Sequence, residues 1–224
     1  MSATPISVDA ISDVVCPWCY LGMRNLLGAW ENLGQSAITI RWRPFQLDPT
    51  IPPTGEDREA YMLKKFGSKD RIEAAHDRIR EAGAAAGIKF DFDAIKVAPN
   101  TLDAHRLIHW AGTLGPEAQT RLVAGLFRAY FEQGRDIGDH EVLVSIAEAA
   151  GMNVNHAREL LSGSVNRKEV LEAVESAQRM GVSGVPCFLL EGRYVLSGAQ
   201  PPEVLEDAIR QVAAAKERGE LNAE

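Results

Sequence analysis

The stretch SDVVCPWCYLG, residues 12–22, contains two cysteines separated by Pro17 and Trp18. Pro17 suits the first position of a helix, because its missing N–H would have no partner there. Cys16 and Cys19 therefore lie at the start of a predicted helix, with both sulfurs at the same end. The unpaired N–H groups and the dipole of a helix N-terminus favour a thiolate. We predict that Cys16, at the tip, attacks a disulfide and that the more buried Cys19 resolves the mixed disulfide.

Strands are predicted on both sides of this helix. Apolar and polar residues alternate over residues 6–10 and again over residues 38–43, which is typical of strands. Between these segments lies a broad apolar helical face that ends at Gly34. The N-terminal part of the chain therefore predicts a β-α-β unit, with Cys16 at the strand-to-helix junction.

The C-terminal part of the chain predicts a helix, a hairpin and a second helix. Asn166 and Glu169 resemble a capping box at the start of the first of these helices, which ends near Met180. The hairpin strands span residues 187–190 and 193–196, and the last helix begins at Pro201–Pro202.

The middle of the chain has a helical texture. Residues 48–55 hold three prolines and a glycine, which predicts a linker. Helices are expected near residues 56–66, 69–86, 101–114, 116–132, 139–149 and 155–162, one of them between Asp139 as N-cap and Gly151 as stop. Removing this block leaves β-α-β-α-β-β-α. We predict an α/β fold in which residues 1–50 and 166–224 form one domain and residues 51–165 an inserted all-helical domain.

Composition excludes several classes of protein. The chain has 224 residues, of which 46% are hydrophobic and 25% charged, as in soluble globular proteins. Its net charge of −7 argues against nucleic acid or an anionic membrane as the main partner. No apolar run approaches the ~18 residues of a membrane helix, and the N-terminus lacks the pattern of a signal peptide. We therefore expect a cytoplasmic protein.

The third cysteine, Cys187, leaves two questions open. A zinc site could combine it with Cys16, Cys19 and a histidine, which would make the chain a non-catalytic zinc-binding module. No second CxxC pair exists, so we expect no metal. Cys187 could also relay the disulfide, but its place in an apolar strand favours a buried, inert thiol.

Val185 and Pro186 precede the strand that contains Cys187. A cis bond between them would expose the backbone of Val185 to an extended substrate and lay the Pro186 ring against the sulfurs. An ordinary loop proline is the alternative, because only about one X-Pro bond in twenty is cis.

Four segments resemble one known family: SDVVCPWCYLG, RPFQLDP, NTLDAHRL and GVSGVPCFLL. Together they are similar to the DsbA-like thioredoxin-fold oxidoreductases, and within them to the FrnE-type dithiol–disulfide isomerases. The resemblance implies a thioredoxin domain interrupted by a helical domain. It also implies that Cys16 is the nucleophile, Cys19 the resolving thiol and Pro186 a cis-proline, with Pro17, Trp18 and Val185 shaping the substrate surface.

The resemblance further implies a thiol–disulfide oxidoreductase or isomerase. Its substrates would be proteins or small molecules that contain a disulfide or a thiol. The redox-active Cys16–Cys19 disulfide would serve in place of a cofactor, with glutathione as a candidate co-substrate. The protein would be a monomer or a homodimer.

A glutathione-dependent isomerase or transferase of the same fold is the alternative function. Chromene-carboxylate isomerases and kappa-class glutathione transferases share this layout, but they typically carry serine at the first active position. This chain keeps cysteines at both positions, which favours dithiol chemistry.

Several polar residues near these motifs have two candidate roles. Ala10 stands where several thioredoxin-fold enzymes carry a buried acid, so Asp13 could transfer protons instead or could cap the loop. His105 could line the cleft below the cysteines, although core or surface positions are expected for both His105 and His109. Asn100 is expected to cap the helix that contains them.

The remaining aromatic and charged residues are expected to be structural. Trp42, Phe45, Phe90, Phe92 and Trp110 are assigned to the core. The charged residues of segment 56–86 are expected to form a solvated helical face.

Overall fold

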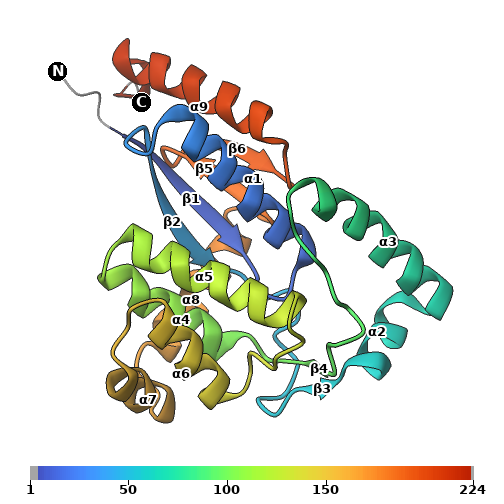
Figure 1. Ribbon diagram of the computed structural model, residues 1–224. Helices are drawn as coiled ribbons and strands as arrows, with labels where there is room; N and C mark the ends of the chain where they lie inside the picture. The colour runs from blue at the N-terminus through green and yellow to red at the C-terminus, as the bar shows by residue number, and fades with distance from the viewer. Residues whose placement is uncertain (1–4, 223–224) are drawn as a thin grey trace.

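The computed structural model describes residues 5–222, and its main sheet has four strands in the order β2–β1–β5–β6 (Figure 1). β1 is parallel to β2 and antiparallel to β5, and β6 is antiparallel to β5. The strands are β1 (Ile6–Ser12), β2 (Ile38–Pro44), β5 (Cys187–Leu190) and β6 (Tyr194–Ser197). The predicted α/β class and all four predicted strands are confirmed.

Burial explains the character of each strand. β1 is central and almost wholly buried, whereas β2 at the edge buries Ile38, Ile40 and Trp42 and turns Arg41 and Arg43 outward. Asp9 on β1 lies beside these two arginines, and its Oδ1 atom is 2.9 Å from Nε of each. An alternating apolar pattern thus fixes the register of β2.

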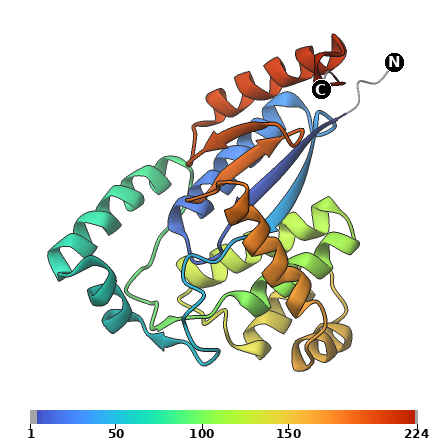
Figure 2. The same ribbon diagram turned by 180° about the vertical axis from the view of Figure 1, so that it is seen from behind.

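Two helices pack side by side next to this sheet, as Figure 1 shows. They are α1 (Pro17–Leu33), which starts at the cysteine pair, and α9 (Pro202–Glu217). Figure 2 shows the sheet from the opposite side, with helix α8 (Arg167–Arg179) at its lower end. α8 packs on β2 and on α4, so the chain returns from the helical segment directly onto the sheet.

The segment between β2 and α8 is mainly helical, as predicted. Its helices are α2 (Arg58–Phe66), α3 (Lys69–Ala85), α4 (Leu102–Thr113), α5 (Pro116–Phe131), α6 (His140–Ala149) and α7 (Val154–Ser162). α4 and α5 pack against β2, while α2 and α3 extend to the side of α1 (Figure 1). A short 3₁₀ helix, Glu220–Asn222, follows α9. The division into two domains remains a prediction.

A pair of short strands in this segment was not predicted. Residues 48–55 contain no helix or strand, as expected, but β3 (Glu56–Asp57) then pairs with β4 (Val97–Ala98). The helix predicted from residue 56 therefore begins two residues later, where the Asp57 side chain accepts the Ala60 N–H at 2.9 Å. The partner strand lies about 40 residues away in the chain, so no local pattern could indicate it.

Helix caps were predicted with mixed success. Asp139 caps α6 by accepting the N–H groups of Glu141 and Val142, as predicted. The capping box at Asn166 is wrong, because the Asn166 side chain accepts the Trp110 indole N–H at 2.7 Å and makes no cap bond.

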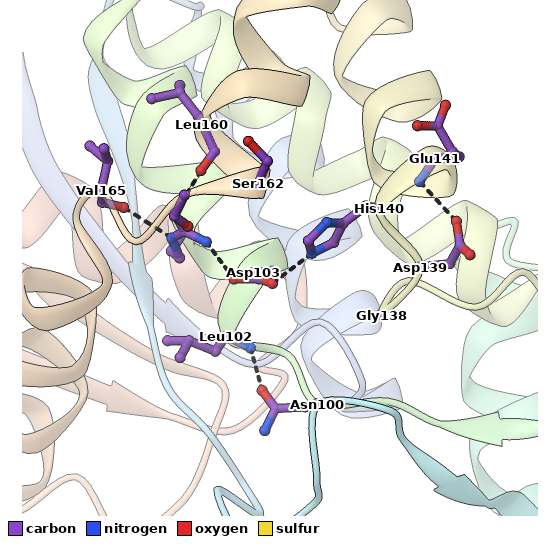
Figure 3. Close-up of polar contacts among 12 residues, drawn as sticks. Asn100, Leu102, Asp103, Gly138, Asp139, His140, Glu141, Leu160, Ser162 and Val165 are labelled. Carbon is purple, nitrogen blue, oxygen red and sulfur yellow. Dashed lines mark hydrogen bonds and ion pairs between the residues drawn. The ribbon is translucent and has the colours of Figure 1, made fainter.

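Asn100 also departs slightly from its expected place. Thr101 is the residue at the N-cap of α4, but the Asn100 side chain accepts the Leu102 N–H at 3.0 Å. It therefore caps α4 from one position earlier (Figure 3).

Arg106 connects several parts of the helical segment. Its side chain is 1% exposed and donates to the carbonyl oxygens of Leu160, Gly163 and Val165. These three acceptors lie in the last turn of α7 and just beyond its C-terminal end. It also pairs with Asp103 at 2.7 Å, and Asp103 in turn contacts His140 at 2.9 Å. One buried guanidinium thus joins α4 to the C-terminal end of α7, and Asp103 extends the contact to α6.

The aromatic residues assigned to the core are largely where they were predicted. Trp42, Phe45, Phe92 and Trp110 are buried, and Phe90 is half-buried. Within residues 5–222, no helix is both long and apolar enough to cross a membrane.

Candidate active site

The two cysteines lie at the N-terminus of α1, with different exposure to the outside. Cys16 is the N-cap residue and has an extended backbone, and Pro17 occupies the first turn. The Cys19 N–H donates to the Cys16 carbonyl at 3.0 Å, which sets the sulfurs one turn apart. Cys16 is 5% exposed and lines a cavity, whereas Cys19 is 1% exposed and does not. Of the two cysteines, Cys16 is therefore the one on the cavity side.

The environment also separates the acidity of the two thiols. A hydrogen bond from the Cys19 thiol, aided by backbone N–H groups of Cys19 and Trp18, lowers the pKa of Cys16, although burial opposes it. Burial raises the pKa of Cys19 well above its usual value, and the adjacent Cys16 sulfur adds to the rise. The accessible sulfur is therefore the one that ionises first, which is what a nucleophile and a resolving thiol require.

The loop before β5 faces these sulfurs. The Val185–Pro186 peptide bond is cis, and the Cys16 thiol donates to the Val185 carbonyl at 3.7 Å. The close approach of this loop to α1 requires Gly22, since a Cβ there would lie 2.8 Å from Cγ of Pro186. The structure thus brings together the residues 12–22 and 181–190 that the sequence singled out.

Asp13 lies on the other side of the cysteines, with His105 as its partner. Asp13 is 1% exposed, and its Oδ2 atom accepts the Leu47 N–H at 2.8 Å. Its Oδ1 atom is 3.3 Å from Nε2 of His105, a side chain that is also 1% exposed. The negative charge of Asp13 raises the pKa of Cys16 and of Cys19. Asp13 therefore fixes the loop at Leu47, whereas its role in proton transfer stays a prediction.

A cavity of about 370 Å³ opens at Cys16. One side is formed by Pro17 and by Trp18, which is 42% exposed. That Trp18 shapes the substrate surface stays a prediction. The opposite side comes from α2 and α3, including Met62 and Ile79. We call this space the Cys16 cavity.

The sequence did not reveal two cations in the Cys16 cavity. Arg58 and Lys65 on α2 line it together with Tyr61. Lys65 is exposed, as expected for the charged residues of segment 56–86, whereas Arg58 is half-buried and departs from that expectation. The spacing of Arg58, Tyr61 and Lys65 does indicate that they share one helix face, because they stand at i, i+3 and i+7. The spacing does not indicate whether that face meets solvent or a cavity.

Cys187 and His109 lie away from the Cys16 cavity. Cys187 is 3% exposed in a small apolar cluster with Ile11, Phe45 and Ala177. Burial raises its pKa, although a hydrogen bond with Ser197 opposes the rise. His109 is exposed and lines a different cavity, beside β2.

No metal-binding cluster is formed by the described side chains. Within residues 5–222, no three His, Cys, Asp or Glu residues are placed to hold one ion. The three cysteines are free thiols, and Cys187 packs in a cluster separate from that of Cys16 and Cys19.

A sheet with a CxxC pair at the start of its first helix and a proline loop facing the sulfurs defines a thioredoxin-like protein. Residues 7–210 match the DSBA-like thioredoxin domain family, and the chain belongs to this family. The predicted thioredoxin fold is thereby confirmed, while the FrnE-type branch stays a prediction.

Curated relatives cover nearly the whole chain. An uncharacterized Bacillus subtilis protein, YwbO, is 26% identical over 214 residues, covering 91% of this chain and 96% of the relative. Human glutathione S-transferase kappa 1 is 23% identical over 214 residues, covering 92% and 91%.

Solved structures give the same fold. A probable DsbA oxidoreductase from Streptomyces coelicolor matches with a TM-score of 0.82 and 30% identity, covering 92% of this chain and 89% of that one. A 2-hydroxychromene-2-carboxylate isomerase matches at 0.70 and 19%, covering 97% and 100%. The cytosolic disulfide reductase DsbM from Pseudomonas aeruginosa, with GSH, matches at 0.63 and 20%, covering 95% and 99%. The family thus includes oxidoreductases, isomerases and glutathione transferases.

Proposed function

We propose that this protein is a dithiol–disulfide oxidoreductase whose reacting groups are Cys16 and Cys19. One observation carries the proposal: Cys16, the one cysteine of the three that lines the Cys16 cavity, has a lowered pKa, and its neighbour Cys19 has a raised one. A glutathione transferase does not need a second thiol at the position of Cys19. A dithiol–disulfide oxidoreductase needs both cysteines, because the two electrons that it transfers come from the pair.

The reaction follows from this geometry. The Cys16 thiolate attacks one sulfur of a substrate disulfide, so that a mixed disulfide forms and one substrate thiolate leaves. Cys19 then loses its proton and attacks Cys16, which releases the second substrate thiolate. Two electrons pass from the cysteine pair to the substrate, and the Cys16–Cys19 disulfide remains. The reverse sequence oxidises a dithiol substrate.

Glutathione is the reductant that we propose for the oxidised pair. The relatives include a disulfide reductase solved with GSH and glutathione transferases, so a glutathione thiol is a consistent partner for a thioredoxin-fold disulfide of this type. We also propose a reducing, cytoplasmic location, in keeping with the cytosolic disulfide reductase among the relatives. Two glutathione molecules would return the pair to the dithiol and leave as glutathione disulfide.

A glutathione-dependent isomerase or transferase is the second candidate, supported by the small Cys16 cavity and by the kappa-class glutathione transferase relatives. The two functions differ in their need for Cys19. Isomerase chemistry on a bound glutathione would survive Cys19→Ser, whereas dithiol turnover would stop.

A redox titration tests the proposed function directly. The protein is equilibrated in glutathione buffers of graded ratio, quenched with acid, alkylated under denaturing conditions and mapped by mass spectrometry. We expect Cys16 and Cys19 to oxidise together as one disulfide, with Cys187 alkylated throughout. Absence of that disulfide, a disulfide through Cys187, or stoichiometric zinc in the purified protein would each contradict the proposal.

We further propose that Asp13 receives the proton that Cys19 loses, with His105 holding the carboxylate in place. Asp13→Asn keeps the shape but removes the charge that raises the pKa of both thiols. The alkylation rate of Cys16 is measured as a function of pH, and the midpoint of this profile, which reports the pKa of Cys16, should therefore move to lower pH. Resolution by Cys19 should nevertheless become slower, because the proton acceptor is lost.

The matched control is Asp48→Asn, since Asp48 lines the same cavity but is held by the Thr50 hydroxyl. It should move neither quantity. If Asp13→Asn changes stability alone, and leaves the alkylation midpoint and the resolution rate as they are, Asp13 only positions the loop.

A further inference from the structure

We infer that the Cys16 cavity selects small disulfides that combine an apolar or aromatic body with a carboxylate. This inference rests on the proposed dithiol chemistry and names its substrate class. It concerns the part of the cavity formed by α2 and α3, which takes no part in the sulfur chemistry itself.

Enclosure argues for a small molecule. Cys16 is only 5% exposed, and its sulfur is reached through a cavity of about 370 Å³. This volume falls at the lower end of the ~300–1,000 Å³ that small-molecule sites occupy. A drug-sized disulfide fits a space of this volume.

The walls argue for an apolar or aromatic body. Met62, Phe66 and Ile79 contribute aliphatic and aromatic surface from α2 and α3. His76 and Phe92 form a stacked pair in the same wall, with ring centroids 4.0 Å apart. Apolar surface of this kind stabilises a ligand by the area that it removes from water.

The charges argue for a carboxylate. Arg58 is half-buried, and within residues 5–222 its side chain has no ion pair or hydrogen bond; its guanidinium carbon lies 6.0 Å from the centroid of the Tyr130 ring. Lys65 lies similarly over the Tyr61 ring at 5.6 Å and has no ion pair in the described part of the chain.

The carboxylates of the cavity do not neutralise these cations. Asp13 accepts from Leu47 and contacts His105, and Asp48 accepts from Thr50. The cavity therefore presents two cations without a carboxylate partner, one of them half-buried. A ligand carboxylate would supply the charge-assisted hydrogen bonds that Arg58 lacks.

A substrate of this class reacts through the same two-step exchange that is described for the proposed function. The disulfide accepts two electrons from Cys16 and Cys19 and leaves as two carboxylated thiolates, and the enzyme keeps the Cys16–Cys19 disulfide. The thiols of glutathione then return the enzyme to its dithiol form.

Two disulfides that differ only in the carboxylate provide the kinetic test: dithiodinicotinate and neutral dithiodipyridine. The measured quantity is the kcat/KM value for dithiodinicotinate divided by that for dithiodipyridine. Each value is first divided by the uncatalysed rate of the same disulfide with dithiothreitol. Arg58→Met should lower this ratio about tenfold, a change of about 1.4 kcal/mol. Arg58→Lys should lower it less. The matched control is Arg71→Met on the exposed face of α3, which should leave the ratio unchanged.

A binding measurement separates this inference from the proposed function. Naphthylthioacetate, which contains no disulfide, and its neutral amide are titrated by calorimetry into the wild-type protein and into Arg58→Met. We expect the wild type to prefer the acid and the variant to lose that preference. Equal binding of acid and amide, a kinetic ratio unaffected by Arg58→Met, or faster normalised turnover of insulin or glutathione disulfide would overturn the inference. Each of these outcomes leaves the dithiol function standing, whereas failure of both disulfides to react would overturn that function.

Discussion

Cys16→Ser is expected to reduce disulfide exchange by at least about 10³-fold, since serine lacks a comparably acidic and nucleophilic group. Cys16 is the only one of the three cysteines that lines the cavity, so neither of the others can take its place. Folding should be little affected, because the hydroxyl fills nearly the same space. The measurement is the rate of thiol release from dithiodipyridine under turnover with glutathione.

Cys19→Ser should give a different result when thiol release is measured from the reduced protein without glutathione. Cys16 can still attack, so one equivalent of substrate thiol is released and the mixed disulfide then accumulates. Mass spectrometry should find the adduct on Cys16. Cys187→Ser is the matched control and should turn over like the wild type, because Cys187 is buried in a separate cluster. Faster alkylation of Cys19 than of Cys16 in the reduced protein would reverse the two roles.

Arg106→Met should destabilise the protein by about 3–5 kcal/mol, as does the loss of one partner of other buried ion pairs. The side chain is 1% exposed, and its removal leaves Asp103 and the carbonyl oxygens of Leu160, Gly163 and Val165 without this donor. Buried acceptors without donors are costly. The stacking contact with Trp110, with the guanidinium carbon 5.0 Å from the ring centroid, is lost as well.

Urea denaturation followed by circular dichroism measures this effect. The matched control is Arg179→Met, which removes an exposed ion pair with Glu175 and should cost less than about 1 kcal/mol. Arg106→Lys should fall between the two, because an ammonium cannot reach all of these acceptors. Similar free energies of unfolding for Arg106→Met and Arg179→Met would show that the guanidinium does not join the helices.

The sequence predicts best where a feature depends on neighbouring residues. The cysteine pair at a helix start and the Asp139 cap are local, and both are found where they were expected. Asn166 has an equally local signal, yet Trp110 from α4 takes its side chain as a hydrogen-bond acceptor instead. A tertiary contact of this kind overrides the tendency of an asparagine to cap the helix that follows it. The spacing of residues near Asn166 does not reveal such a contact.

The candidate site shows the same limit. The segments containing Cys16 and Val185 could be paired only through a family resemblance, since 169 residues separate them. Arg58 and Lys65 escaped prediction because a charged helix face has the same pattern whether it meets water or a cavity. Asp13 and His105 were identified as candidates, but their contact depends on how α4 lies against the end of β1.

The place of α2 and α3 in the chain has an evolutionary consequence. The sulfur chemistry resides in the residues that connect β1 to α1 and in the loop before β5, whereas much of the opposing wall comes from α2 and α3. In the proposed function, substrate preference and redox potential therefore depend on separate stretches of the chain. Descendants can acquire new substrates through changes confined to residues 58–79 and retain an unaltered electron-transfer centre.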